Sequence, residues 1–182
     1  MLQITIPKRE IFDQETQTFI QVKETHVTLE HSLVALSKWE SKWHKAFLKP
    51  NQELSDDELL DYIRCMTITQ NVDPISYHAL TQENIAEIRA YIEDPMTATH
   101  ISNHDRHPAS REVVTSELIY YWMIACQIPM ECQKWHLNRL MALIKVCQIK
   151  MNPEKQKMSK AQIRARNSKL NAARRAKMHS KG

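Results

Sequence analysis

The chain has 182 residues, a formal net charge of +4 and a single glycine, Gly182. P-loops, dinucleotide-binding turns and nucleophile elbows all need glycine, because their backbone approaches a ligand closely or adopts a positive φ. The composition therefore excludes these sites. It predicts a mainly α protein that binds and assembles, without enzyme activity and without a cofactor.

Charge is distributed unevenly along the chain. From Glu154 to Lys181 there are ten Lys or Arg residues and one acid, which gives +9 and leaves −5 for residues 1–153. The sequence therefore describes a mildly acidic body with a strongly basic tail. No apolar stretch reaches transmembrane length, and the N-terminus lacks the pattern of a signal peptide. We therefore expect a cytoplasmic protein that does not contact a membrane.

The first segments alternate apolar and polar side chains, which is typical of half-buried strands. The alternation covers residues 2–6 and 17–22, with turn-forming residues at 13–16 between them. We predict a small β-hairpin within an N-terminal β element, residues 1–27. Pro7 ends the first strand or places it at a sheet edge.

Apolar residues then recur every three or four positions, which predicts a helix at 28–47 that Pro50 stops. The stripe contains three aromatic residues with flanking lysines, which suit a core, a protein interface or stacking on nucleic-acid bases. Trp43 and Phe47 are predicted in the core. Trp39 stays open between the core and a partner-binding position, and it is the candidate contact residue of the body.

An acidic cluster begins the next predicted helix. Ser55 and Glu58 have the spacing of a capping box, and acids in the first turn are favoured by the helix dipole. The cluster consists of Asp56, Asp57, Glu58 and Asp61. Paired carboxylates can also perform general acid–base catalysis, but capping explains their position better.

Further capping signals divide the middle of the chain. Asp73 followed by Pro74 predicts a short helix through Leu80, and Thr81 is predicted to cap a helix at 82–93.

A segment without periodicity follows at 95–109, which we expect to be a surface loop. It contains His100, His104 and His107, the nearest approach to a metal site in the sequence. They lack an HExxH context, and the chain has no CxxC pair, so we predict no bound metal. The four cysteines are expected to be reduced, buried apolar residues.

Two apolar helices complete the predicted body, residues 28–152. Ser110 is expected to cap a helix at 111–127, which is apolar nearly all round and therefore central and buried. After a proline break, a helix at 131–150 should pack against it as a hairpin. The expected core residues are Leu118, Ile119, Trp122, Leu140, Ile144 and Trp43.

The sequence of the tail, residues 153–182, predicts a basic helix with little apolar surface. We expect this helix to bind an acidic partner. That partner could be nucleic acid or an acidic protein surface, and a role in solubility alone is the alternative. The candidate partner-binding residues are Arg164, Arg166, Lys169, Arg174, Arg175 and Lys177.

Four segments carry a resemblance to a known family: LEHSLVALSKWESKWHKAFL (29–48), DYIRCMTITQNVDP (61–74), TSELIYYWMIACQIPMECQKWHLNRLMALIKVC (115–147) and KMSKAQIRARNSKLNAARRAK (157–177). They resemble tail assembly chaperones of long-tailed bacteriophages. The resemblance covers about residues 28–178.

The resemblance implies a non-enzymatic morphogenesis factor in the cytoplasm of a bacterial host. Such a chaperone binds the phage tape-measure protein and assists assembly of tail-tube protein, and it has no catalytic residues. A homo-oligomer is compatible with this role. Two alternatives stay open: a neck or tail protein of the virion, and a nucleic-acid-binding protein acting through the basic tail.

Overall fold

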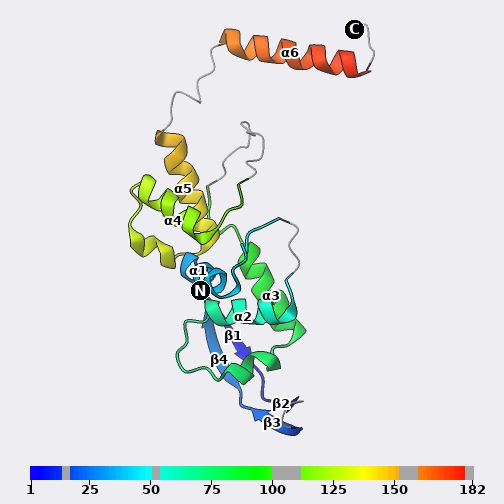
Figure 1. Ribbon diagram of the computed structural model, residues 1–182, viewed down its shortest axis with the longest axis vertical. Helices are drawn as coiled ribbons and strands as arrows, with labels where there is room; N and C mark the ends of the chain where they lie inside the picture. Colours follow the sequence, from blue (N-terminus) through cyan, green and yellow to red (C-terminus); the bar gives the residue numbers. More distant parts are fainter. Residues whose placement is uncertain (14–16, 51–53, 100–111, 152–159, 179–182) are drawn as a thin grey trace. The chain divides into compact units, whose positions relative to one another are not determined.

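The computed structural model describes residues 1–13, 17–50, 54–99, 112–151 and 160–178 (Figure 1). The chain forms two compact units, Met1–Ile144 and Lys145–Gly182. Helices predominate over strands in the described residues, which confirms the mainly α prediction.

Four strands form two small antiparallel sheets in the first unit. The strands are β1 (Leu2–Ile6), β2 (Arg9–Asp13), β3 (Thr18–Val22) and β4 (Thr25–Leu29). β1 pairs with β4, and β2 pairs with β3. The expected pairing of residues 2–6 with 17–22 is therefore wrong, because two further strands provide the partners. Pro7 follows β1 directly and cannot donate a backbone hydrogen bond to the ladder.

The first helix, α1 (Leu33–Trp43), is shorter at both ends than the predicted range 28–47. Ser32 caps its start, because the hydroxyl accepts a hydrogen bond from a first-turn N–H group. His44 ends it in a left-handed conformation with φ 52°, before Pro50 is reached. Periodicity could not show these limits, since the apolar pattern runs on from β4 into the helix.

The middle helices agree with their predicted capping signals. Ser55 and Thr81 both form complete capping boxes, and Asp73 accepts from a backbone N–H in front of a 3₁₀ helix. These elements are α2 (Asp56–Met66), η1 (Pro74–Ala79) and α3 (Gln82–Glu93).

The last helices of the body differ from their predicted limits. They are α4 (Ser116–Ala125), the 3₁₀ helix η2 (Met130–Lys134) and α5 (Leu137–Met151). Thr115 is the N-cap of α4, whereas the predicted cap, Ser110, lies outside the described residues. The predicted connection between the last two helices is also wrong, because the 3₁₀ helix η2 lies between α4 and α5. Both α4 and η2 pack on α1.

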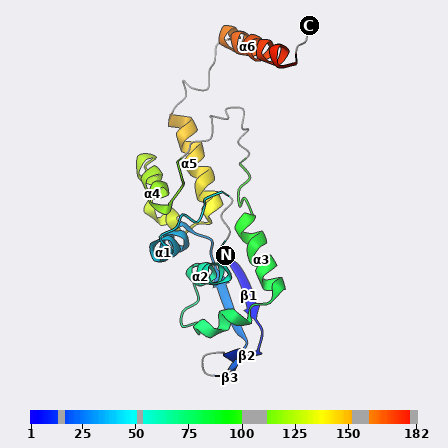
Figure 2. The same ribbon diagram turned by 45° about the vertical axis from the view of Figure 1, so that its right-hand side comes forward.

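The main core lies between the strands and the first three helices, so the predicted β element shares one core with the body. Figures 1 and 2 show β1 and β4 beside α2 and α3. Its members include Ile6, Leu29, Trp39, Tyr62 and Ile88.

Three of the six predicted core residues are buried and three are only partly buried. The buried ones are Ile119, Leu140 and Ile144; the others are Leu118, Trp122 and Trp43. The prediction that α4 is a central helix is wrong, because one of its faces is open to solvent. The four cysteines are reduced thiols, and only Cys132 is buried, so the expected burial is wrong for the other three.

Candidate functional site

The basic tail contains the helix α6 (Lys160–Met178). Five of its six candidate binding residues have exposed side chains, and that of Lys177 lies outside the described side chains. The five are Arg164, Arg166, Lys169, Arg174 and Arg175. Ile163 and Leu170 are 45% and 47% exposed and lie two turns apart on one face. The helix therefore presents two apolar side chains among cationic groups.

Trp39, the candidate contact residue of the body, is completely buried, so a partner cannot reach it in this fold. Its indole N–H donates to the backbone oxygen of Glu58 at 2.9 Å. Its ring meets Phe47 edge-on, with centroids 5.1 Å apart, and stacks on Trp43. The expected burial is therefore reversed. Trp43 and Phe47, which were predicted in the core, are only partly buried, whereas Trp39 is fully buried.

The acidic cluster at the start of α2 is engaged in structural contacts. Asp61 accepts from Lys42 at 2.5 Å and from the indole N–H of Trp43 at 2.8 Å. Glu58 bonds to Lys45 and to the backbone N–H of Ser55, and the Lys45 contact is the main cause that lowers the Glu58 pKa. These partners account for both carboxylates, which favours the capping interpretation over acid–base chemistry.

Two exposed apolar surfaces occur on the first unit. On α4, Tyr121 and Ile124 are 64% and 67% exposed and lie one turn apart on the same face. On the β2–β3 sheet, Phe12 and Phe19 face each other across the strands with ring centroids 5.2 Å apart. The sequence indicated neither surface, because apolar composition alone suggested burial of α4.

A buried carboxylate from α1 fixes the position of α4. Glu40 accepts from the backbone N–H of Ser116 at 2.7 Å and from that of Phe47 at 3.0 Å. Thr115 makes no side-chain bond to the helix backbone, and Glu40 satisfies the N–H group of Ser116, the first residue of α4. The Tyr120 hydroxyl also bonds to Gln133 of η2 at 2.9 Å. These contacts hold α4 in position on α1 and η2, with its outward face exposed.

A buried histidine pair was not indicated by the sequence. His31 lies between β4 and α1, and His136 lies directly before α5; their ring centroids are 5.1 Å apart. Burial, and then the neighbouring His136, lower the pKa of His31 to about 3. The hydroxyl of Tyr62 lies 2.6 Å from His31 Nδ1, and burial raises its pKa. His31 is therefore neutral near pH 7, and its Nδ1 accepts a hydrogen bond from the Tyr62 hydroxyl.

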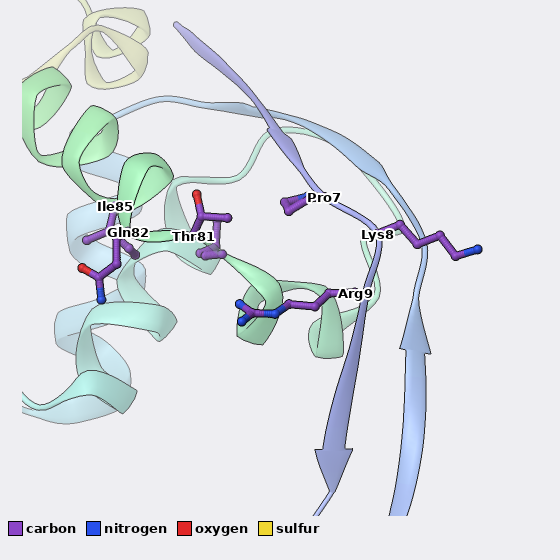
Figure 3. Close-up of a pocket in the computed structure, with 7 residues that line it drawn as sticks. Pro7, Lys8, Arg9, Thr81, Gln82 and Ile85 are labelled. Atoms are coloured by element: carbon purple, nitrogen blue, oxygen red, sulfur yellow. The ribbon is translucent and has the colours of Figure 1, made fainter.

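A pocket of about 620 Å³ lies between the β1–β2 link and the start of α3. Figure 3 shows Arg9 extending toward Thr81, whereas Lys8 extends away from the other labelled residues. The lining residues are Pro7, Lys8, Arg9, Leu80, Thr81, Gln82 and Ile85. Thr81 is already paired with Asn84 in its capping box, and the lining includes no carboxylate, thiol or imidazole.

The histidines predicted at the loop, His100, His104 and His107, lie outside the described residues. Within the described ranges, no three His, Cys, Asp or Glu side chains are grouped so that they could hold a metal ion. In the same part of the chain, no helix combines the length and the apolar character needed to span a bilayer. Comparisons of the chain with protein-family models, curated proteins and solved structures found no match.

Proposed function

We propose that this protein is a non-enzymatic phage morphogenesis factor, a tail assembly chaperone that binds the tape-measure protein and assists tail-tube assembly. The observation that carries the proposal is the pair Tyr121 and Ile124, two large apolar side chains exposed on a fixed helix. The resemblance of the sequence segments to phage chaperones supports the identity of the client.

The α4 face suits an amphipathic helix as its partner. Such helices bind through apolar side chains spaced three or four residues apart, and Tyr121 and Ile124 have the matching spacing. Glu117, one turn before Tyr121, is also exposed. Hydrogen bonds with backbone and Thr115 lower the pKa of Glu117, so it is ionised at neutral pH. A client helix with a basic residue beside its apolar stripe therefore fits this face.

The basic tail would contribute by long-range attraction. The +9 charge of residues 154–181 draws acidic segments of a client toward the chaperone, which raises the rate of encounter more than the final affinity. Apolar contacts at α4 would then hold the client. In this proposal the basic tail attracts the client and the α4 face retains it.

Co-purification with a co-expressed tape-measure protein tests the proposal. The double variant Tyr121→Ser, Ile124→Ser should lose most of the bound client, because it removes the apolar contacts without disturbing buried groups. Val113→Ser is the matched control, since Val113 is 44% exposed but precedes α4. Equal client recovery with the double variant and the control would refute the proposal for this face.

Nucleic-acid binding is the second candidate function, and the exposed basic side chains of α6 favour it. Arg164→Ala combined with Arg175→Ala should then weaken binding to RNA or DNA. The slope of log affinity against log salt should also become shallower, because fewer phosphate contacts release counterions. A tail that binds an acidic protein instead should form a complex that resists nuclease.

A further inference from the structure

The start of α5 is tied to the junction between β4 and α1 by contacts around the histidine pair. The backbone N–H of Leu137 donates to the His31 oxygen at 2.7 Å, and Ser32 and His136 form an isolated antiparallel bridge. Asn138 donates to the backbone oxygens of Ile92 and Asp94 at 2.9 and 2.7 Å. One short segment, residues 136–138, therefore fastens α5 to both α1 and α3.

Hydrogen bonds occupy ring nitrogens of both imidazoles. His136 Nε2 lies 3.0 Å from the Tyr91 backbone oxygen, to which it donates, and its Nδ1 accepts from the Asn138 N–H at 3.3 Å. His31 Nδ1 accepts from the hydroxyl of Tyr62. His31 and His136 are only 2% and 6% exposed. A further proton on either Nδ1 would remove an acceptor that the fold uses.

Within the described residues, no carboxylate is in hydrogen-bonding contact with the His31 ring. The titratable rings that contact the pair are those of Tyr62, beside His31, and Tyr91, beside His136. Glu40 and Cys65 act electrostatically on Tyr62, and Glu30 and Asp94 act on Tyr91. Glu30 accepts from the Tyr91 hydroxyl at 2.8 Å, and Glu40 holds two backbone N–H groups. Both nearby glutamates are thus engaged with other donors.

We propose that His31 is the sensor of an acid-sensitive latch, formed with His136, that ties the start of α5 to the β4–α1 junction and releases it on protonation. The rings of His136 and Tyr62 both meet His31 edge-on. Tyr62 belongs to the main core, whereas His136 lies directly before α5. Movement of residues 136–138 would therefore expose a protonated His31 without opening the main core. α5 continues into the second unit. The latch therefore lies at the start of the helix that leads along the chain to the basic tail.

Proton linkage fixes the size and direction of the effect. In an opened latch His31 regains its ordinary affinity for protons, so acid favours the open form below about pH 6.5. Because half of the open form is already protonated at pH 6.5, the open-to-closed ratio should rise about 16-fold between pH 6.5 and 5.

Hydrogen exchange of the full chain, corrected for intrinsic exchange rates, measures this ratio. Protection of amides in residues 137–144 should fall about 16-fold between pH 6.5 and 5, and amides of β1, residues 2–6, should stay better protected at both pH values because they exchange only on global unfolding. His31→Gln should abolish the difference between the two pH values, since an amide oxygen can still accept from Tyr62 but does not titrate. His78→Gln, which changes an exposed histidine, should retain it.

Three outcomes would overturn the latch. Unchanged protection of residues 137–144 at pH 5 would show that the segment does not open. Equal protection of residues 2–6 and 137–144 at both pH values would show that both segments exchange through global unfolding in place of local release. An undiminished response in His31→Gln would place the sensor elsewhere. If that variant fails to fold, the pH series on the unaltered protein still decides between the first two outcomes and the latch.

Discussion

At the scale of residues, buried polar side chains fix how the elements meet. Glu40, which is 7% exposed, holds α4, and His31 with His136 joins α5 to the rest of the first unit. None of these roles could be predicted from the sequence, because each depends on a partner far along the chain. Glu40 and Ser116 are 76 positions apart.

Replacing Glu40 by alanine should lower the free energy of unfolding by about 1–3 kcal/mol. The reason is that two backbone N–H groups, those of Phe47 and Ser116, lose their acceptor in a buried position. Urea unfolding followed by circular dichroism measures the change. Glu87→Ala, on the exposed face of α3, is the control and should shift stability by less than about 0.5 kcal/mol. Similar losses in both variants would contradict the capping role of Glu40.

The stability of the whole protein should also fall as the pH decreases from 6.5 toward 3. The folded-state pKa of His31 is about 3, below its ordinary value of 6.5, so the unfolded chain binds the proton more strongly in this range. Stability from this group is present above pH 6.5. It decreases by about 2 kcal/mol on going to pH 5. Urea midpoints for the unaltered protein and His31→Gln test this, and parallel pH curves would contradict it.

At the scale of elements, the sequence predicted the features that depend on neighbouring residues. It did not predict the features that depend on segments far apart in the chain. The capping box at Ser55 and the cap at Thr81 each depend on four consecutive residues, and both are present as expected; Thr81 also forms a full capping box with Asn84. Strand pairing and the start of α4 depend on distant segments, so alternation and apolar runs did not determine them. The same reason explains Trp39: helical spacing shows a shared face, but it does not show which neighbours cover that face.

Ser55→Ala should lower the free energy of unfolding by about 1 kcal/mol, because the serine hydroxyl accepts from the Glu58 N–H at the start of α2. Thr115→Ala is the matched control, since Thr115 occupies the N-cap of α4 without bonding to the helix backbone. Thr115→Ala should lower the free energy of unfolding clearly less than Ser55→Ala does. Equal costs measured in urea would show that cap propensity, and not the observed hydrogen bond, determines the effect.

At the scale of the whole molecule, the structure separates a packed first unit from a second unit whose described side chains in α6 are exposed. The core is built from strands and helices of the first unit alone. The residues of this core all precede the basic tail, so the core does not draw on the tail.

Deleting residues 152–182 should therefore leave the first unit folded. The thermal midpoint should change by no more than about 4 °C, because less than about 1 kcal/mol of packing is expected to be lost. Differential scanning calorimetry measures the midpoint, and near-ultraviolet circular dichroism reports whether the tryptophan environment is retained. Loss of the cooperative transition would show that the tail is part of the core.

Photo-crosslinking from α4 tests the proposed function most directly. A photoreactive amino acid at position 124, in cells that also produce the tape-measure and tail-tube proteins, should crosslink to a helical segment of the tape-measure protein identified by mass spectrometry. The same probe at position 87, on the exposed face of α3, should give little of this product. Crosslinking to the tape-measure protein from position 87 but not from 124 would contradict the assignment of α4 as the client-binding face.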